Sequence, residues 1–234
     1  MHEQHGVPRI DVLLIRHGSL DDGDAVLWGR TPGVVLSRRG HREMSRLADA
    51  LAPAGLRRIV SSPQLRTLES AGVLARGLGA SIDVDADADE FDFGQWTGGR
   101  FDELQQDERW RRFNEHRSSA SAPHGESVTS FQARIRRLID RRLASGEAPA
   151  CIVTHAEVIR TLILDALGLE ADAWQNVSIA PASLTALHGV RRPLRIMALG
   201  LDAAAIADSL WEGSQRATAR DTPVPPHAPT VPRA

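Results

Sequence analysis

Residues 10–18 read Ile-Asp-Val-Leu-Leu-Ile-Arg-His-Gly, a mostly apolar run of branched side chains that ends in two basic residues and a glycine. Such a run is typical of a β-strand buried on both faces of a parallel sheet. Arg16 and His17 would then lie at the carboxyl end of this strand. Because ligands bind at the carboxyl ends of strands in open parallel sheets, the stretch predicts both a fold class and the location of a site.

The alternation of strands and helices continues along the chain. Apolar strand patterns occur at 58–62, 82–84 and 150–154, and two last strands, 184–187 and 194–199, flank a turn. Helical spacing of apolar residues occurs at 44–51, 71–78, 101–117, 128–143 and 158–166. We therefore expect an α/β fold, a three-layer sandwich with a mostly parallel sheet, helices on both faces and an antiparallel edge strand toward the C-terminus.

Single residues predict where these helices begin and end. Ser37 is suited to be the N-cap of the first helix, and Pro53 would end that helix. Pro63 suits the first position of the next helix, and Gly168 would end the helix at 158–166. We expect one domain over residues 1–212, followed at 213–234 by a Pro-rich tail that is disordered.

Composition limits the classes of protein to which the chain can belong. With 42% apolar and 25% charged residues it can bury a core, and its net charge of −2 favours neither nucleic acid nor an anionic membrane as partner. The lone cysteine, Cys151, cannot form an internal disulfide, which fits a reducing cytoplasm. No stretch approaches about 18 uninterrupted apolar residues, so neither a membrane span nor a secretory signal is expected.

Three polar clusters follow three of the predicted strands: Arg16-His17, Ser61-Ser62 with Arg66 one turn further on, and Thr154-His155. Guanidinium groups pair with phosphate oxygens in a bidentate way, and an imidazole held in one tautomer can attack phosphorus. A single histidine at a strand end is more often structural, and an arginine on a helix more often belongs to a solvated face. Convergence at one edge of the sheet nevertheless favours phosphoryl transfer to a histidine.

Five segments, in order and spanning roughly residues 10–165, resemble the histidine phosphatase superfamily, which includes cofactor-dependent phosphoglycerate mutases. Alone, the Arg16-His17-Gly18 signature of the first segment would have little specificity, but the ordered set is specific. The other segments are Gly29-Arg30-Thr31 with Leu36-Ser37-Arg38-Arg39-Gly40, Ser61-Ser62-Pro63 with Arg66-Thr67 and Ser70-Ala71, Glu90 to Gly98, and Gly125-Glu126-Ser127 with Val153 to Arg160.

The resemblance implies a role for each matching residue. His17 would be the nucleophile that forms a phosphohistidine, and His155 would face it. Arg16 and Arg66 would clamp the phosphoryl oxygens. Glu90 would protonate the leaving-group oxygen and then help to activate water, a role that needs a carboxyl group protonated near the working pH.

The resemblance also implies what the site binds. Arg30, in the second segment, would contact the substrate, which we expect to be a small phosphorylated metabolite. No cofactor and no metal are expected, because two arginines and two histidines supply the positive charge. The oligomeric state stays open, with a homodimer as one option.

The sequence departs from the family pattern at four places. Ser19-Leu20 replace a usual Glu or Gln, Gly23 replaces a frequent Asn, and Ala156-Glu157 replace a pair of glycines, all of which bear on substrate choice. The segment between Glu90 and Gly125 is shorter than the insertion of the mutases and lacks one of their lysines. This fourth departure favours hydrolysis over mutase chemistry.

Several interpretations stay open. Besides a phosphomonoesterase, the sequence is compatible with a phosphoglycerate-type mutase or with a catalytically weak module that binds phosphorylated ligands. Glu157 fits either a helix N-terminal charge or a substrate contact. We expect the arginine clusters at 109–112 and 134–142 to form exposed helix faces. Nucleic-acid binding through them is poorly supported, because the chain is near neutral.

Overall fold

The computed structural model describes residues 10–21, 25–146, 149–189 and 191–209. Six strands form one sheet in the order β3-β2-β4-β1-β5-β6. The first four strands in that order run parallel, β5 runs antiparallel to β1, and β6 runs antiparallel to β5. This confirms the mostly parallel sheet with an antiparallel edge, which comprises two strands. The bounds are β1 Val12–Arg16, β2 Arg58–Ser61, β3 Ser81–Val84, β4 Ala150–Thr154, β5 Leu184–His188 and β6 Arg195–Leu201.

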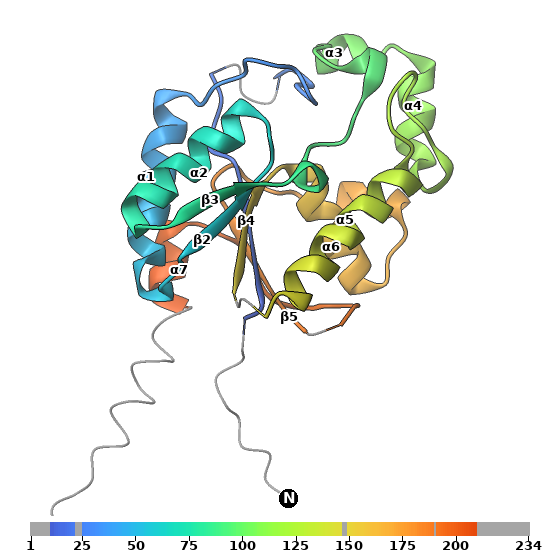
Figure 1. Ribbon diagram of the computed structural model, residues 1–234. Coiled ribbons are helices and arrows are strands. Elements are labelled where there is room, and N and C mark those ends of the chain that lie inside the picture. The colour runs from blue at the N-terminus through green and yellow to red at the C-terminus, as the bar shows by residue number, and fades with distance from the viewer. Residues whose placement is uncertain (1–9, 22–24, 147–148, 190, 210–234) are drawn as a thin grey trace, which may run out of the picture.

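Helices cover both faces of the sheet, so the predicted three layers are confirmed (Figure 1). One face carries α1 (Arg38–Leu51), α2 (Leu65–Leu78) and α7 (Ala203–Ser209), and the other carries α5 (Val128–Ala144) and α6 (Ala156–Leu167). Two short helices, α3 (Phe101–Leu104) and α4 (Glu108–Glu115), lie beyond the carboxyl ends of the strands. Within the described ranges, no helix combines the length and the apolar character needed to cross a bilayer.

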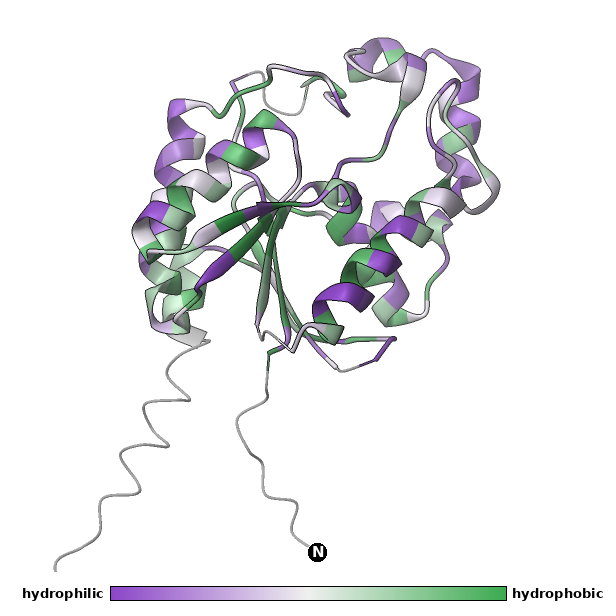
Figure 2. Ribbon diagram, in the orientation of Figure 1, coloured by the Kyte–Doolittle hydropathy of each residue, from purple (hydrophilic) through white to green (hydrophobic). Residues whose placement is uncertain are grey.

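Strand β1 is buried on both faces, which explains its apolar sequence (Figure 2). Leu13 and Ile15 pack into the hydrophobic core with α1 and α2, whereas Val12 and Leu14 pack into the core with α5 and α6. Because side chains alternate between the two faces of a strand, one apolar run serves two separate cores. This double burial keeps β1 in the interior of the sheet.

Two helix ends agree with the signals in the sequence. The side chain of Ser37 accepts a hydrogen bond from the backbone N–H of Gly40 and so caps α1, as predicted. Gly168 follows the last residue of α6 and adopts the left-handed conformation that favours glycine, also as predicted.

Other boundaries differ from the prediction. Pro63 does not open the second helix, because α2 begins at Leu65 after an extended N-cap residue. The helix predicted over 101–117 is two helices, because Asp107 caps a second start within it. Helix α7 is absent from the prediction and packs against α1 and β6. The tail predicted at 213–234 and the departure at Gly23 lie outside the described residues.

Replacing Ser37 with alanine is expected to lower the free energy of unfolding by about 1 kcal/mol. The change removes the bond to the N–H of Gly40 and the bond that the hydroxyl donates to the carbonyl of Ser19. Equilibrium unfolding in urea measures the difference, and the exposed Ser118→Ala is the control. A loss no larger than that of the control would contradict the capping role.

Candidate active site

The carboxyl ends of neighbouring strands bring together the polar clusters identified in the sequence. The backbone N–H of His17 donates to the carbonyl of Thr154 (3.0 Å), and that of Ser62 donates to the carbonyl of Val153 (3.1 Å), so the ladders continue past the strand ends. The ring centres of His17 and His155 lie 5.4 Å apart, with 65° between the ring planes. Both histidines are buried, and the two imidazoles predicted to meet do so.

The loop after His17 is held by close backbone packing. A Cβ atom on Gly18 would lie 2.7 Å from the carbonyl oxygen of Gly40, closer than real Cβ atoms come, so the first turn of α1 packs directly on this loop. The backbone N–H of Gly18 also donates to the hydroxyl of Ser70 on α2 (3.2 Å). The position of His17 therefore depends on Gly18 and Gly40 and on the helices α1 and α2.

His17 is held in one tautomer. Its Nδ1 lies 2.9 Å from the carbonyl oxygen of Gly18, and since a carbonyl can only accept, Nδ1 carries the proton. Burial first, and then the charges of Arg16 and Arg66, lower the pKa of His17 well below 6.5. The ring is therefore neutral, and the lone pair on Nε2 is available for attack.

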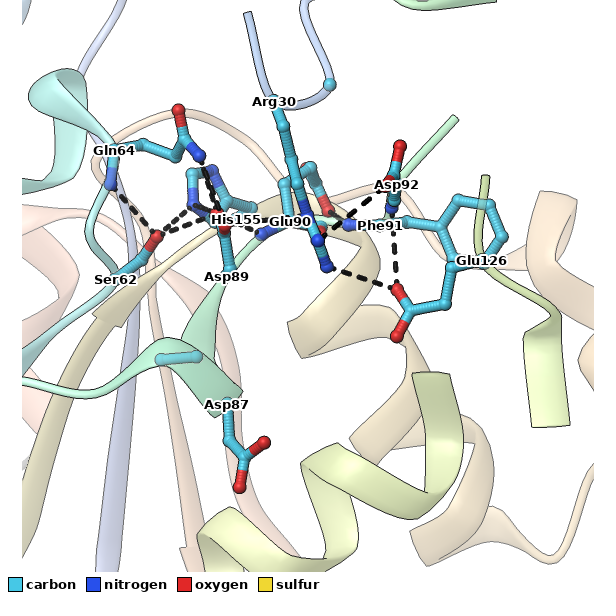
Figure 3. Close-up of polar contacts among 12 residues, drawn as sticks. Arg30, Ser62, Gln64, Asp87, Asp89, Glu90, Phe91, Asp92, Glu126 and His155 are labelled. Atoms are coloured by element: carbon cyan, nitrogen blue, oxygen red, sulfur yellow. Dashed lines mark hydrogen bonds and ion pairs between the residues drawn. The ribbon is translucent and has the colours of Figure 1, made fainter. Parts of the chain in front are cut away.

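His155 is also neutral and is oriented by its neighbours. Its Nδ1 accepts a hydrogen bond from Nη2 of Arg66 (3.2 Å), so its Nε2 donates to the hydroxyl of Ser62 (2.7 Å). The Ser62 hydroxyl donates in turn to the carboxylate of Asp89 (3.2 Å). Burial, followed by the charge of Arg66, lowers the pKa of His155 well below 6.5. This network fixes the ring opposite His17, and Figure 3 shows its members Ser62, Asp89 and His155.

Two arginines supply positive charge beside the histidines. Arg66, in the first turn of α2, is only 2% exposed and donates from Nη2 to the carbonyl of Gly29. Among the described residues, its buried Nε and Nη1 have no hydrogen-bond partner. Arg16 donates from Nη1 to the carbonyl of Ile179 and lines the same cleft. Buried guanidinium donors without a partner are suited to bind an anion.

Glu90 has the protonation behaviour expected of a general acid. It is 8% exposed, and burial, followed by the negative charge of Glu157, raises its pKa from 4.5 to about 7. A hydrogen bond from the backbone N–H of Phe91 to Oε1 (2.9 Å) and the charges of Arg66 and Arg16 partly oppose this rise. The carboxyl group is therefore divided between its two forms near neutral pH.

Arg134 holds the backbone that carries Glu90. Its Nη1 donates to the carbonyls of Asp87 (2.9 Å) and Asp89 (2.7 Å), and its Nη2 donates to the carbonyl of Glu90 (2.8 Å). Nε and Nη2 also bind the carboxylate of Glu126 at 2.8 and 3.0 Å. Arg134 is 6% exposed, so the prediction of an exposed face is wrong at this position. The carbonyls and Glu126 supply the partners that its burial requires.

Arg30 packs against the loop that contains Asp89, Glu90 and Asp92, here called the acidic loop, and does not line the cleft (Figure 3). Its Nε donates to the carbonyl of Glu90 (2.8 Å), and its guanidinium pairs with Asp89 at 3.4 Å, Asp92 at 3.7 Å and Glu126 at 3.3 Å. The expected contact of Arg30 with the substrate is therefore not what the geometry shows. The guanidinium group of Arg30 is engaged by three carboxylates of the protein.

A cleft of about 1080 Å³ opens over His17. Phe101 and Trp110, from α3 and α4, contribute to its wall, so the segment between Glu90 and Gly125 shapes the space beside the reacting groups. No group of three or more His, Cys, Asp or Glu side chains in the described ranges is placed to hold a metal ion. The lining includes Arg16, His17, Arg66, Glu90, Trp28, Phe93, Phe101, Trp110 and Trp174.

No sequence pattern predicted the charged cluster on one wall of this cleft. Glu157, in the first turn of α6, accepts hydrogen bonds from Nη1 of Arg117 (2.7 Å) and from Nη1 of Arg160. The guanidinium carbon of Arg117 lies 3.8 Å from the ring centre of Trp174. Arg117 is 6% exposed, and only its tertiary partners, which spacing in the sequence does not reveal, explain this burial.

The fold and the site define an α/β protein with buried arginines and neutral histidines at the strand ends. These groups are suited to bind an anion such as a phosphoryl group. The chain belongs to the histidine phosphatase superfamily (branch 1), whose family model matches residues 12–201. Phosphatases and phosphoglycerate mutase-like proteins are both among its relatives.

Sequence comparison finds relatives that are much longer than the matched segment and relatives that the segment covers almost entirely. The chain is 31% identical over 177 residues to the bifunctional protein Rv2228c of Mycobacterium tuberculosis. The matched segment covers 74% of this chain and 49% of the relative. The chain thus spans about half the length of that relative. It is 24% identical over 188 residues to the probable phosphoglycerate mutase GpmB of Erwinia tasmaniensis, covering 79% of this chain and 87% of the relative.

Solved structures share the fold. Mycobacterial glucosyl-3-phosphoglycerate phosphatase Rv2419c superposes with a TM-score of 0.71 and 25% identity, covering 82% of this chain and 99% of the other. Phosphoserine phosphatase from Entamoeba histolytica superposes with a TM-score of 0.71 and 20% identity, covering 83% and 98%.

Replacing Arg134 with methionine is expected to lower the free energy of unfolding by at least about 3 kcal/mol, because Glu126 and three carbonyls lose a buried partner. Arg137→Met is the matched control, because Arg137 lies on the same helix, is 60% exposed and pairs with the side chain of Asp87. Urea unfolding of both variants measures the contrast. Equal losses would show that Arg134 is not the anchor of the loop.

Proposed function

We propose that the protein is a phosphomonoesterase that hydrolyses a small phosphorylated metabolite through a phosphohistidine on His17, without a metal ion. The observation that carries the proposal is the neutral, buried His17, whose Nδ1 is held by Gly18 and which shares a cleft with Arg16 and Arg66. A nucleophile fixed by its second nitrogen and flanked by cations suits attack on a phosphoryl group.

In the first step, Nε2 of His17 attacks phosphorus and the bond from phosphorus to the ester oxygen breaks. Arg16 and Arg66 bind the phosphoryl oxygens, and His155 keeps Arg66 oriented through the hydrogen bond that its Nδ1 accepts. Glu90 delivers its proton to the departing alkoxide oxygen, so an alcohol leaves and a phosphohistidine and a carboxylate remain.

In the second step, the Glu90 carboxylate takes a proton from a water molecule whose oxygen attacks phosphorus. The bond between phosphorus and Nε2 breaks, His17 returns to its neutral form and inorganic phosphate leaves. The pKa of about 7 supports both uses of the carboxyl group, since each protonation state is accessible near neutral pH. The lone buried thiol of Cys151 supports our further expectation of a cytoplasmic location.

The mutase alternative is motivated by relatives named as probable phosphoglycerate mutases. It differs by requiring that the phosphoryl group pass to a second hydroxyl instead of to water. Activity only with phosphoglycerates and a bisphosphate primer would favour it. Binding of phosphorylated ligands without turnover of any ester would favour the non-catalytic module.

The direct test is turnover of p-nitrophenyl phosphate without added metal. His17→Ala is expected to lower kcat/KM by at least about 1000-fold, because no other group replaces the nucleophile. His41→Ala, an exposed histidine on α1, is expected to keep wild-type activity. Turnover that survives in the His17 variant would remove this residue from the mechanism.

The pH profile tests Glu90. Because the pKa of its carboxyl group is raised to about 7, the acid form dominates below that pH and is lost above it. For an alkyl phosphate, whose leaving group needs a proton, kcat/KM is expected to fall as the pH rises through 7.

Glu90→Gln is expected to lower kcat/KM for the alkyl ester by about 100-fold or more, with a smaller loss for p-nitrophenyl phosphate. The difference between the wild-type and variant profiles isolates Glu90, because ionisation of the substrate affects both alike. An alkaline limb that persists unchanged in the variant belongs to another group.

A further inference from the structure

Each nitrogen of the Arg117 guanidinium donates a hydrogen bond within the protein. Nη1 binds Glu157 (2.7 Å), while Nε and Nη2 bind the side-chain oxygen of Asn114 at 3.3 and 3.0 Å. Its faces are covered by aromatic rings, with Trp174 at 3.8 Å and Phe113 at 5.1 Å from the guanidinium carbon. Although Arg117 lines the cleft, the edge formed by Nε and Nη2, on which a carboxylate could form a bidentate pair, is occupied by Asn114.

Arg160 is engaged in a similar way. Its Nη1 binds Glu157, and its Nε donates to the carbonyl of Val177 (2.9 Å). The side chains of Glu157 and Arg160 are only 14% and 13% exposed. The two cations on this wall are therefore directed at Glu157, and the group that they hold in the cleft is itself an anion.

Glu157 is ionised and close enough to act on the reacting groups. Burial alone would raise its pKa, but the charges of Arg117 and Arg160 outweigh burial and keep the pKa below its usual value. Glu157 lies two residues after His155 and lines the same cleft as His17 and Glu90. Among the neighbouring charges, that of Glu157 has the largest effect on the pKa of Glu90, and it raises that pKa. The charge of Glu157 therefore acts at the carboxyl group that is proposed to deliver the proton.

We propose that Glu157 selects the substrate class: this site takes phosphomonoesters of alcohols that carry no second anionic group, and it discriminates against esters with a carboxylate beside the phosphate. A substrate carboxylate would meet the fixed carboxylate of Glu157, to which both arginines of this wall donate from Nη1. Neutral polyol or sugar-like bodies meet instead the aromatic side chains of Trp28, Phe101, Trp110 and Trp174 on the cleft wall. This inference rests on the proposed phosphomonoesterase activity.

A matched pair of substrates tests the proposal. Glycerol 3-phosphate and 3-phosphoglycerate differ in having a hydroxymethyl group or a carboxylate at the far end, so the ratio of their kcat/KM values reports on that charge. We expect the wild type to prefer glycerol 3-phosphate by at least about tenfold. Glu157→Gln is expected to reduce this preference by about tenfold, because it removes a full charge near the leaving group.

Controls separate local from general effects. Asp165→Asn makes the same charge change further along α6, where Asp165 pairs with the exposed Arg136, and is expected to leave the ratio unchanged. Glu157→Gly, which restores the residue expected from the family pattern, provides a second variant if the buried glutamine impairs folding. The wild-type preference needs no variant, and p-nitrophenyl phosphate turnover monitors the chemical step in each protein.

Three results would overturn the proposal. The first is a wild type that turns over 3-phosphoglycerate as well as glycerol 3-phosphate. The second is an unchanged ratio in folded, active Glu157 variants, and the third is an equal shift in Asp165→Asn. Absence of any p-nitrophenyl phosphate turnover would instead defeat the proposed activity itself, and the substrate-class inference with it.

Discussion

The guanidinium groups of Arg16 and Arg66 lie beside His17 and His155, at the edge of the sheet where both imidazoles are buried. This arrangement favours neutral imidazoles, because a third positive charge there would be poorly solvated and repelled. It also leaves donors on Arg66 without a partner among the described residues, so a bound phosphoryl group would complete the site. The neutral state of the proposed nucleophile and the proposed anion clamp follow from this one buried electrostatic balance, whereas the elevated pKa of Glu90 comes from burial and from the charge of Glu157.

The fold supports that balance through its backbone. The parallel ladders of β1, β2 and β4 bring His17, Ser62 and His155 to one edge of the sheet. On the other side of the site, Arg134 and Arg30 bind the carbonyl of Glu90. His17 and Glu90, the proposed nucleophile and the proposed acid, are thus fixed by different parts of the molecule, a β-ladder and a loop tied by ion pairs.

The parts predictable from sequence are those with a local or periodic signal. The apolar run at 10–15 predicted a central strand, and the strand ends then predicted that His17, His155 and Arg66 converge. Arg117 and Arg134 escaped prediction, because an arginine is normally exposed and its burial depends on partners distant along the chain. Arg30 was assigned to the substrate by resemblance, whereas the carboxylates of the acidic loop engage it. The capping of α4 by Asp107 and the start of α2 at Leu65 are local features, but apolar spacing alone does not reveal them.

The central claim is that His17 becomes covalently phosphorylated during turnover. Rapid quenching of the enzyme with substrate into alkali, followed by peptide mass spectrometry, measures it, because phosphohistidine survives alkali and is lost in acid. The account predicts one acid-labile phosphoryl group, located on the peptide that contains His17 and formed no more slowly than the steady-state rate. Phosphorylation at another residue, or steady turnover with no phosphorylated His17 peptide at any time, would contradict it.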